Sequence, residues 1–165
     1  QRQALQPVPR RRGRSDGVSV ALSDEGRAGP IAREIAARAR RMLSYLGLRS
    51  EVSLLFVTEA RMAALNAEHM GERGPTDVLS FGEFRKRTDI RPIDGRIELG
   101  DLVLSPSFIR RAAEDDAVSF ETEMAFIFSH GIFHLLGFRH SKRMFSMQDE
   151  IAGSYNVSQG KKKNI

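Results

Sequence analysis

The chain has 165 residues, a length that suits one domain with a core large enough to fold without disulfides or a structural metal. It contains no cysteine, which excludes thiolate metal sites, a nucleophilic cysteine and a disulfide framework. No apolar run approaches the length of a membrane span, and the start lacks the apolar stretch of a secretory signal. These features predict a cytoplasmic protein without a membrane partner, with an organelle matrix as the alternative.

The charge of the chain is concentrated at its two ends. The net charge is +5 and the pI is about 10.1. Residues 1–17 hold five arginines against one aspartate, and three lysines follow Gly160. Both segments have little apolar material to bury, so we expect tails at 1–17 and 158–165 around one folded domain at 18–157. Each tail fits a phosphate-seeking arm, and equally a solubilising tail or the remains of a transit peptide.

Strand and helix patterns alternate along the body of the chain. Strands are expected at 18–22, 51–57, 76–81 and 99–105, and helices at 30–46, 59–70, from 106, from 119 and over 141–152. Pro30 suits the first turn of a helix, and Gly47 suits its end. Polar residues with proline and glycine predict a loop over 83–96. We find no internal repeat and no interior linker, which favours a single domain.

Three of the four histidines are spaced as ligands of one metal ion. His130 and His134 are four residues apart, so on a helix they project from one face about 40° apart. His140 lies beyond Gly137, which can end the helix in a left-handed conformation and turn the chain back. Three protein ligands leave the fourth position to water, as in catalytic zinc sites. The alternative is that these are ordinary core or surface imidazoles.

The same spacing occurs in metzincin-type peptidases, which need a glutamate directly after the first histidine as general base. Here that position is Gly131, which cannot transfer a proton. Without this base a peptidase would lose a factor of about 10²- to 10⁴-fold in reaction rate, so a zinc peptidase is a distant alternative. RNA hydrolysis fits better, because the ribose 2′-hydroxyl is an internal nucleophile and a metal with cationic groups can stabilise the phosphate charge.

Three sequence motifs resemble the YbeY family of metal-dependent endoribonucleases. They are GPTDVLSF at 74–81, ELGDLVLS at 98–105 and SHGIFHLLGFRH at 129–140. The likeness extends from about residue 18 to residue 152, and the three-histidine block is its most specific part.

The resemblance implies an α+β fold, with a small mixed four-stranded sheet flanked by helices in a single domain. It implies that His130, His134 and His140 hold one zinc ion, with another divalent metal such as nickel as the alternative. It also implies a nuclease for single-stranded RNA that matures ribosomal RNA, above all the small-subunit 3′ end, and acts in ribosome quality control. The expected partners are ribosomal RNA and the small ribosomal subunit.

Two departures from the family pattern concern the site. Met70 stands where the family usually has an arginine near the metal, so we expect weakened cleavage. Arg73, three residues later, is the candidate to supply that charge, and we predict it to be catalytic together with His130 and His134. Arg139 stands where an aspartate usually precedes the third ligand, which removes an acceptor for a ligand imidazole and offers a phosphate contact instead.

A different class of function is a ribosome-assembly or RNA-binding factor with weak or no nuclease activity. This alternative is supported by Met70, which replaces the usual family arginine near the metal. A closed structural site would need a fourth protein ligand, and His69 and Asp101 are the evident candidates. Asp77 and Asp101 match the family strands and are interpreted first as structural hydrogen-bonding residues and second as site carboxylates. The candidate RNA-binding residues are Arg33, Arg38, Arg40 and Arg41 on the first helix, together with Arg139. A solvated helix face is the alternative for the first four.

Overall fold

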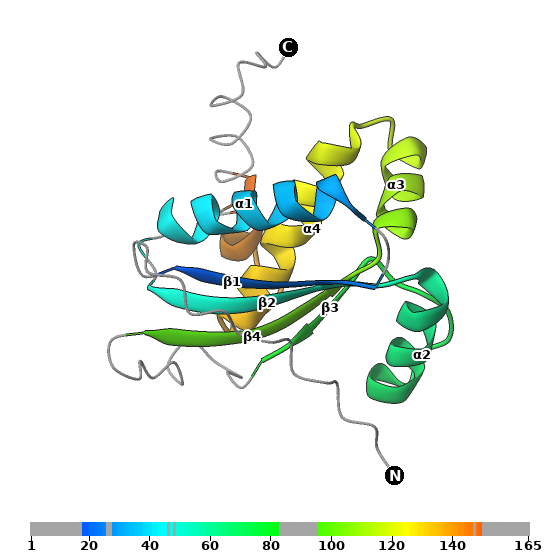
Figure 1. Cartoon of the computed structure of the whole chain (residues 1–165), viewed down its shortest axis with the longest axis horizontal. Helices are drawn as coiled ribbons and strands as arrows, with labels where there is room; N and C mark the ends of the chain where they lie inside the picture. Colours follow the sequence, from blue (N-terminus) through cyan, green and yellow to red (C-terminus); the bar gives the residue numbers. More distant parts are fainter. Residues whose placement is uncertain are drawn as a thin grey trace.

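A mixed four-stranded sheet forms the centre of the computed structural model, which describes residues 18–25, 28–45, 47, 49–82, 96–146 and 148–149 (Figure 1). The strands are β1 (Ser19–Asp24), β2 (Ser50–Phe56), β3 (Val78–Phe81) and β4 (Ile97–Leu104), in the spatial order β1-β2-β4-β3. β1 and β4 pair in parallel with β2, whereas β3 pairs antiparallel with β4. The predicted α+β class and mixed sheet are confirmed.

The central strand β2 is apolar on both of its faces because the sheet is covered on both sides. Leu54 and Phe56 belong to the larger core cluster, while Leu55 and Val57 belong to a smaller cluster on the opposite face. Side chains alternate between the two faces of a strand, so a continuous apolar run indicates a strand buried on both sides. The strand predicted at 51–57 is therefore confirmed, together with its burial.

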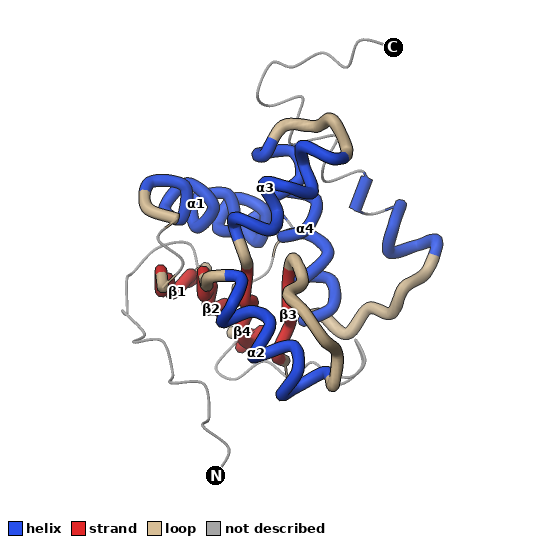
Figure 2. The backbone as a smooth tube through the Cα atoms, turned by 90° about the vertical axis from the view of Figure 1, so that its right-hand side faces the viewer, coloured by secondary structure: helices blue, strands red, loops and turns tan. Residues whose placement is uncertain are grey.

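Of the four helices α1 to α4, three lie over one face of the sheet and one lies over the other (Figures 1 and 2). The larger cluster holds α1 (Pro30–Tyr45), α3 (Pro106–Asp115) and α4 (Phe120–Leu135) against the sheet. The smaller cluster joins the opposite face to α2 (Glu59–Met70). Among the described residues, no helix has the length and apolar character to cross a bilayer.

The predicted elements agree with the structure to within two residues at the ends that it describes. Gly47 has a φ of 68°, as expected of a residue that ends a helix. The last predicted helix is described over 142–146 and at 148–149, where Met144 is buried. The loop predicted at 83–96, apart from its last residue, and both predicted tails lie outside the described residues.

A bulge in β4, in its pairing with β2, includes Gly100, which lies against the edge strand β3. Glu51 pairs with Glu98 but Val52 pairs with Gly100, so one extra residue enters β4. Gly100 has a φ of 114°, and a Cβ there would lie 2.2 Å from the carbonyl oxygen of Phe81 in β3. Glycine is thus required for two reasons, the backbone conformation and the close approach of β3.

We predict that Gly100→Ala lowers the free energy of unfolding by about 2 to 4 kcal/mol, because the left-handed strain adds to a backbone clash. Gly47→Ala is the matched control, since its φ is also positive but no atom lies within 4 Å of the new Cβ. It should cost about 1 kcal/mol. Urea denaturation measures both, and equal losses would contradict the bulge argument.

Candidate metal centre

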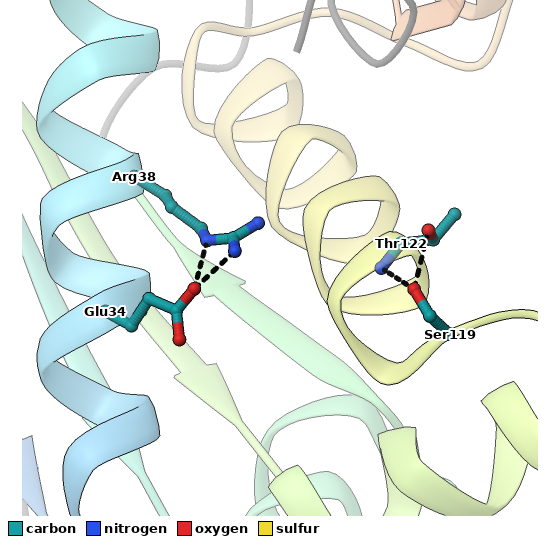
Figure 3. Close-up of polar contacts among 4 residues, drawn as sticks. All are labelled: Glu34, Arg38, Ser119 and Thr122. Carbon is teal, nitrogen blue, oxygen red and sulfur yellow. Dashed lines mark hydrogen bonds and ion pairs between the residues drawn. The ribbon is translucent and has the colours of Figure 1, made fainter. Parts of the chain in front are cut away.

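Helix α4 carries two of the three histidines near its C-terminal end. The helix begins after Ser119, whose hydroxyl accepts a hydrogen bond from the backbone N–H of Thr122 at 3.1 Å (Figure 3). This N-cap satisfies one of the free donors of the first turn. His130 and His134 follow on one face of the last turns, and both side chains are partly buried.

Gly131 lets α4 lie close to the sheet beside the first histidine. A Cβ at Gly131 would meet Cδ2 of Leu102 at 2.8 Å and Cγ2 of Val78 at 3.3 Å. Any side chain at this position would have to move the end of the Leu102 side chain, so α4 packs closely on the sheet here. The position where a metzincin carries its glutamate base is therefore occupied by a packing glycine.

The chain turns back after α4 through a Schellman motif centred on Gly137. Gly137 has a φ of 77°, and its N–H donates to the carbonyl of His134 at 2.9 Å. The N–H of Phe138 donates to the carbonyl of Phe133 at 3.0 Å, and the two aromatic rings pack edge to face at 5.2 Å. Both hydrogen bonds and the apolar contact are those of this motif. The left-handed turn predicted at Gly137 is present, and it brings His140 back toward α4.

The Nε2 atoms of the three histidines converge on one point. His134 Nε2 lies 3.0 Å from His130 Nε2 and 3.1 Å from His140 Nε2, and the third side of the triangle is 3.2 Å. Three nitrogens bound tetrahedrally to zinc at about 2.0 to 2.1 Å are separated by about 3.3 Å. The triangle therefore fits a zinc-sized ion, and these three residues form a potential metal-binding group.

The proton positions that the structure requires also suit metal binding. His134 Nδ1 lies 3.2 Å from the carbonyl oxygen of Phe138, which can only accept a hydrogen bond. The proton of His134 is therefore on Nδ1, and Nε2 has a lone pair for the metal. Burial lowers the pKa of His134 and of His130, and the neighbouring imidazoles lower both further. These two rings are thus favoured in the neutral form that ligates metals.

An open cleft of about 380 Å³ lies beside two of the histidines. Its lining comes from the end of α2, from the segment that leads into and includes β3, and from α4. We call it the histidine cleft, and its residues are Met70, Asp77, Val78, Leu79, Ser80, His130 and His134. Met70, which replaces the usual family arginine, has 49% of its surface exposed and lines this cleft. A side chain at position 70 therefore faces the space in front of the histidines.

The two aspartates of the predicted strands differ in their position. Asp77 accepts hydrogen bonds through Oδ1 from the N–H of Val78 at 2.7 Å and from the hydroxyl of Thr76 at 3.1 Å. It also lines the histidine cleft, and its charge opposes the burial that lowers the pKa of His130. Asp101 pairs with Phe81 across the two strands and does not line the cleft. Asp77 thus combines both predicted roles, the structural one and proximity to the site.

No fourth protein ligand joins the three histidines within the described part of the chain. His69 packs its ring against Phe81 at a centroid distance of 4.9 Å, in an edge-to-face arrangement. Asp101 is likewise outside the group. The arrangement is that of a site with an open coordination position, as in catalytic zinc centres.

Of the predicted arginines of α1, Arg38 is placed away from the histidines. Arg38 pairs with Glu34 and lines a different pocket, between α1 and the first turn of α4 (Figure 3). His130 is ten residues after Phe120, which lines that pocket, so it lies about 15 Å further along α4. Arg33 and Arg41 are exposed, and Arg40 donates to the carbonyl of Val20 at 3.5 Å. Their RNA-binding role stays a prediction.

Arg73 and Arg139 are both exposed residues of loops. Arg73 follows α2 and is not among the residues that line the histidine cleft, whereas Arg139 directly precedes His140. Their catalytic and RNA-binding roles also stay predictions. The sequence analysis missed two residues near the site, Phe145 and Gln148. The signal for Gln148 was its spacing of four from Met144, which places an amide on the buried face of the last helix.

Comparison with known proteins identifies the family. The family model described as Endoribonuclease YbeY matches residues 23–156. The chain belongs to the YbeY endoribonuclease family. Endoribonuclease YbeY of Shouchella clausii (strain KSM-K16) is 37% identical over 155 residues, which span 85% of this chain and 96% of that protein. Endoribonuclease YbeY of Thermobifida fusca (strain YX) is 35% identical over 150 residues, covering 86% of this chain and 96% of the relative.

A solved structure supports the fold. The solution structure of TM1509 from Thermotoga maritima superposes with a TM-score of 0.57 at 22% sequence identity. The match covers 89% of this chain and 97% of that protein. The sequence-based assignment to the YbeY family is therefore confirmed by the family model and by the relatives.

We predict that zinc stabilises the protein through the three histidines. At a free concentration of 100 times the dissociation constant, zinc should add about 2.7 kcal/mol to the free energy of unfolding. His140→Ala should abolish this gain without disturbing the core, because His140 is exposed. His69→Ala, which removes the histidine outside the group, is the control and should keep the gain. Thermal denaturation with and without zinc gives the answer, and a gain that survives His140→Ala would contradict the site.

Proposed function

We propose that this protein is a metal-dependent endoribonuclease that cleaves single-stranded RNA at the histidine cleft. The observation that carries the proposal is the group of three converging Nε2 atoms, with an open coordination position beside a cleft, in a chain of the YbeY endoribonuclease family. His130, His134 and His140 are the proposed metal ligands. Zinc is the proposed metal because three imidazoles at this spacing suit it, with nickel as the alternative.

The residues of the cleft have separate proposed roles in the reaction. A bound zinc ion supplies a Lewis acid for phosphoryl oxygens. The His134 ring is held by the Phe138 carbonyl, so its ligating nitrogen keeps its direction. Asp77 lines the cleft and accepts hydrogen bonds from Thr76 and from the N–H of Val78, so it holds the segment that leads into β3 in place. Arg73 is the proposed source of positive charge for the phosphate.

The proposed biological substrate is ribosomal RNA, in particular the 3′ end of the small-subunit RNA, with the small ribosomal subunit as partner. Family membership and the three sequence motifs support this proposal. We also propose a part in ribosome quality control and a cytoplasmic location, which follow from the same resemblance.

We predict that His134→Ala lowers the rate of cleavage of a labelled single-stranded ribosomal RNA fragment by about 100-fold or more, because it removes a metal ligand. His69→Ala should cleave at the parental rate, since this ring contacts Phe81 and lies outside the metal group. The same sequence in a duplex should resist cleavage by all three proteins. Equal loss in both variants would contradict the assignment of the site.

The second candidate function is an RNA-binding assembly factor with little nuclease activity. It is favoured by Met70, since the described residues that line the histidine cleft include no arginine or lysine. A developing negative charge on the phosphate would then depend on the metal and on groups outside this lining.

We predict that Met70→Arg raises the cleavage rate by about tenfold or more, because a cation placed in the cleft stabilises the charge of the transition state. Met70→Gln is the matched control, because glutamine is about as long as methionine and is polar like arginine but carries no charge. It should leave the rate near the parental value. Single-turnover cleavage separates the chemical step from binding. An unchanged rate in Met70→Arg would contradict the proposed reason for weak activity.

A basic segment beside the third ligand offers a path for the RNA strand. Arg139, Lys142 and Arg143 are exposed, and Phe145 is 43% exposed. The ring of Phe145 stacks on the ring of His140 with a centroid distance of 6.0 Å and an angle of 7°. Positive charges with an aromatic platform are the features that bind single strands without reading sequence. We therefore assign the phosphate contacts first to this segment and second to the α1 arginines.

We predict that the double variant Arg139→Ala/Arg143→Ala binds single-stranded RNA more weakly and reduces the salt slope of its affinity by about 1. The control, Arg33→Ala/Arg41→Ala, removes two exposed arginines from α1 and should change the slope less. Affinity is measured by fluorescence anisotropy at several salt concentrations, without metal so that the RNA stays intact. A larger change in the α1 variant would place the RNA along α1 instead.

A further inference from the structure

Gln148 is a fully buried amide, with 0% of its surface exposed, in the segment that follows the third histidine. Its Nε2 donates a hydrogen bond to the carbonyl oxygen of Phe126 at 2.9 Å. Phe126 lies one helical turn before His130 on α4. Gln148 is thus attached to the ligand helix from outside that helix, beside the metal group.

Two buried polar atoms at this place have no hydrogen-bond partner. They are Oε1 of Gln148, which can only accept, and Nδ1 of His130. The two side chains meet at the same turn of α4, since Gln148 binds the carbonyl of Phe126, which lies four residues before His130. The bond from Nε2 to Phe126 fixes the amide plane, so Oε1 is the atom left for the histidine. The pair is an acceptor and a potential donor, close together but without hydrogen-bond geometry in this structure.

A metal-bound histidine needs a hydrogen-bond acceptor for the ring nitrogen that does not bind the metal. A histidine that ligates through Nε2 carries its proton on Nδ1, and that N–H is nearly always donated to an acceptor that fixes the ring. His134 has such an acceptor in the Phe138 carbonyl. His130 lacks one, although its Nδ1 is buried. In a buried site an unpaired N–H is unfavourable, so an acceptor within reach is expected to be used.

We infer that Gln148 is the positioning residue of His130, whose Nδ1–H donates to Oε1 of Gln148 when Nε2 of His130 binds the metal. This inference rests on the metal site of the proposed function. Gln148 then orients the first ligand as the Phe138 carbonyl orients the second. The aspartate that usually precedes the third ligand in the family is absent here, and Gln148 provides an acceptor at a different ligand.

The test is the affinity of the full chain for zinc alone, measured by competition with a chromophoric chelator. Gln148→Leu should weaken zinc binding by about 10- to 100-fold, because the ring of His130 loses its acceptor. Gln148→Glu should bind zinc at least as tightly as the parent, since a carboxylate is a stronger acceptor. Ser129→Ala is the matched control, because Ser129 also donates to the Phe126 carbonyl, at 2.7 Å, without belonging to the metal group.

A second measurement is made first on the parent alone and then on Gln148→Leu. In the zinc-loaded parent, the Nδ1–H proton of His130 should give an exchange-protected NMR signal, and Gln148→Leu should lose it. An unprotected proton in the parent, or equal weakening of zinc binding by Gln148→Leu and Ser129→Ala, would overturn the inference. Parental zinc affinity in Gln148→Leu would overturn it while leaving the three-histidine site intact. Failure of the parent to bind zinc would overturn both.

Discussion

The left-handed turn at Gly137 is the constraint on which the site depends. It ends α4, satisfies the carbonyls of Phe133 and His134, and reverses the chain so that His140 returns to the two helical histidines. The same turn presents the Phe138 carbonyl to Nδ1 of His134, which fixes the tautomer of a ligand. The end of α4 and the metal site therefore depend on the same turn. A change that straightens this turn would remove the third ligand and would also remove the acceptor that orients the second.

The local part of this arrangement could be predicted from the sequence, because it depends on helical spacing and on one glycine. The strands could also be predicted, since the apolar run Leu54–Val57 in and directly after β2 reflects burial on both faces. The bulge at Gly100 could not, because it lies in the pairing of β4 with β2, a strand distant in sequence. The distance of Arg38 from the histidines could not be predicted either, since it depends on how α1 packs against α4. Gln148 was missed because its partners lie on another helix.

The unusual residue at position 70 lies directly in the histidine cleft. The side chain lines the histidine cleft from the end of α2, where the left-handed Gly71 closes the helix. A methionine there supplies apolar surface but no charge. Basic residues are instead found beside the third ligand, at Arg139, Lys142 and Arg143. The proposed enzyme thus has its metal ligands in place, and among the described residues these three cations adjoin the third ligand rather than position 70.

Three imidazole nitrogens are proposed to hold one metal ion and to leave a coordination position open. X-ray absorption spectroscopy of the zinc-loaded protein tests this arrangement most directly, because it reports the number, type and distance of the ligands. We expect three imidazole nitrogens at about 2.0 to 2.1 Å and one further light atom that an added anion can replace. Four imidazole or carboxylate ligands from the protein that no anion displaces would contradict it, and so would a protein that retains no zinc.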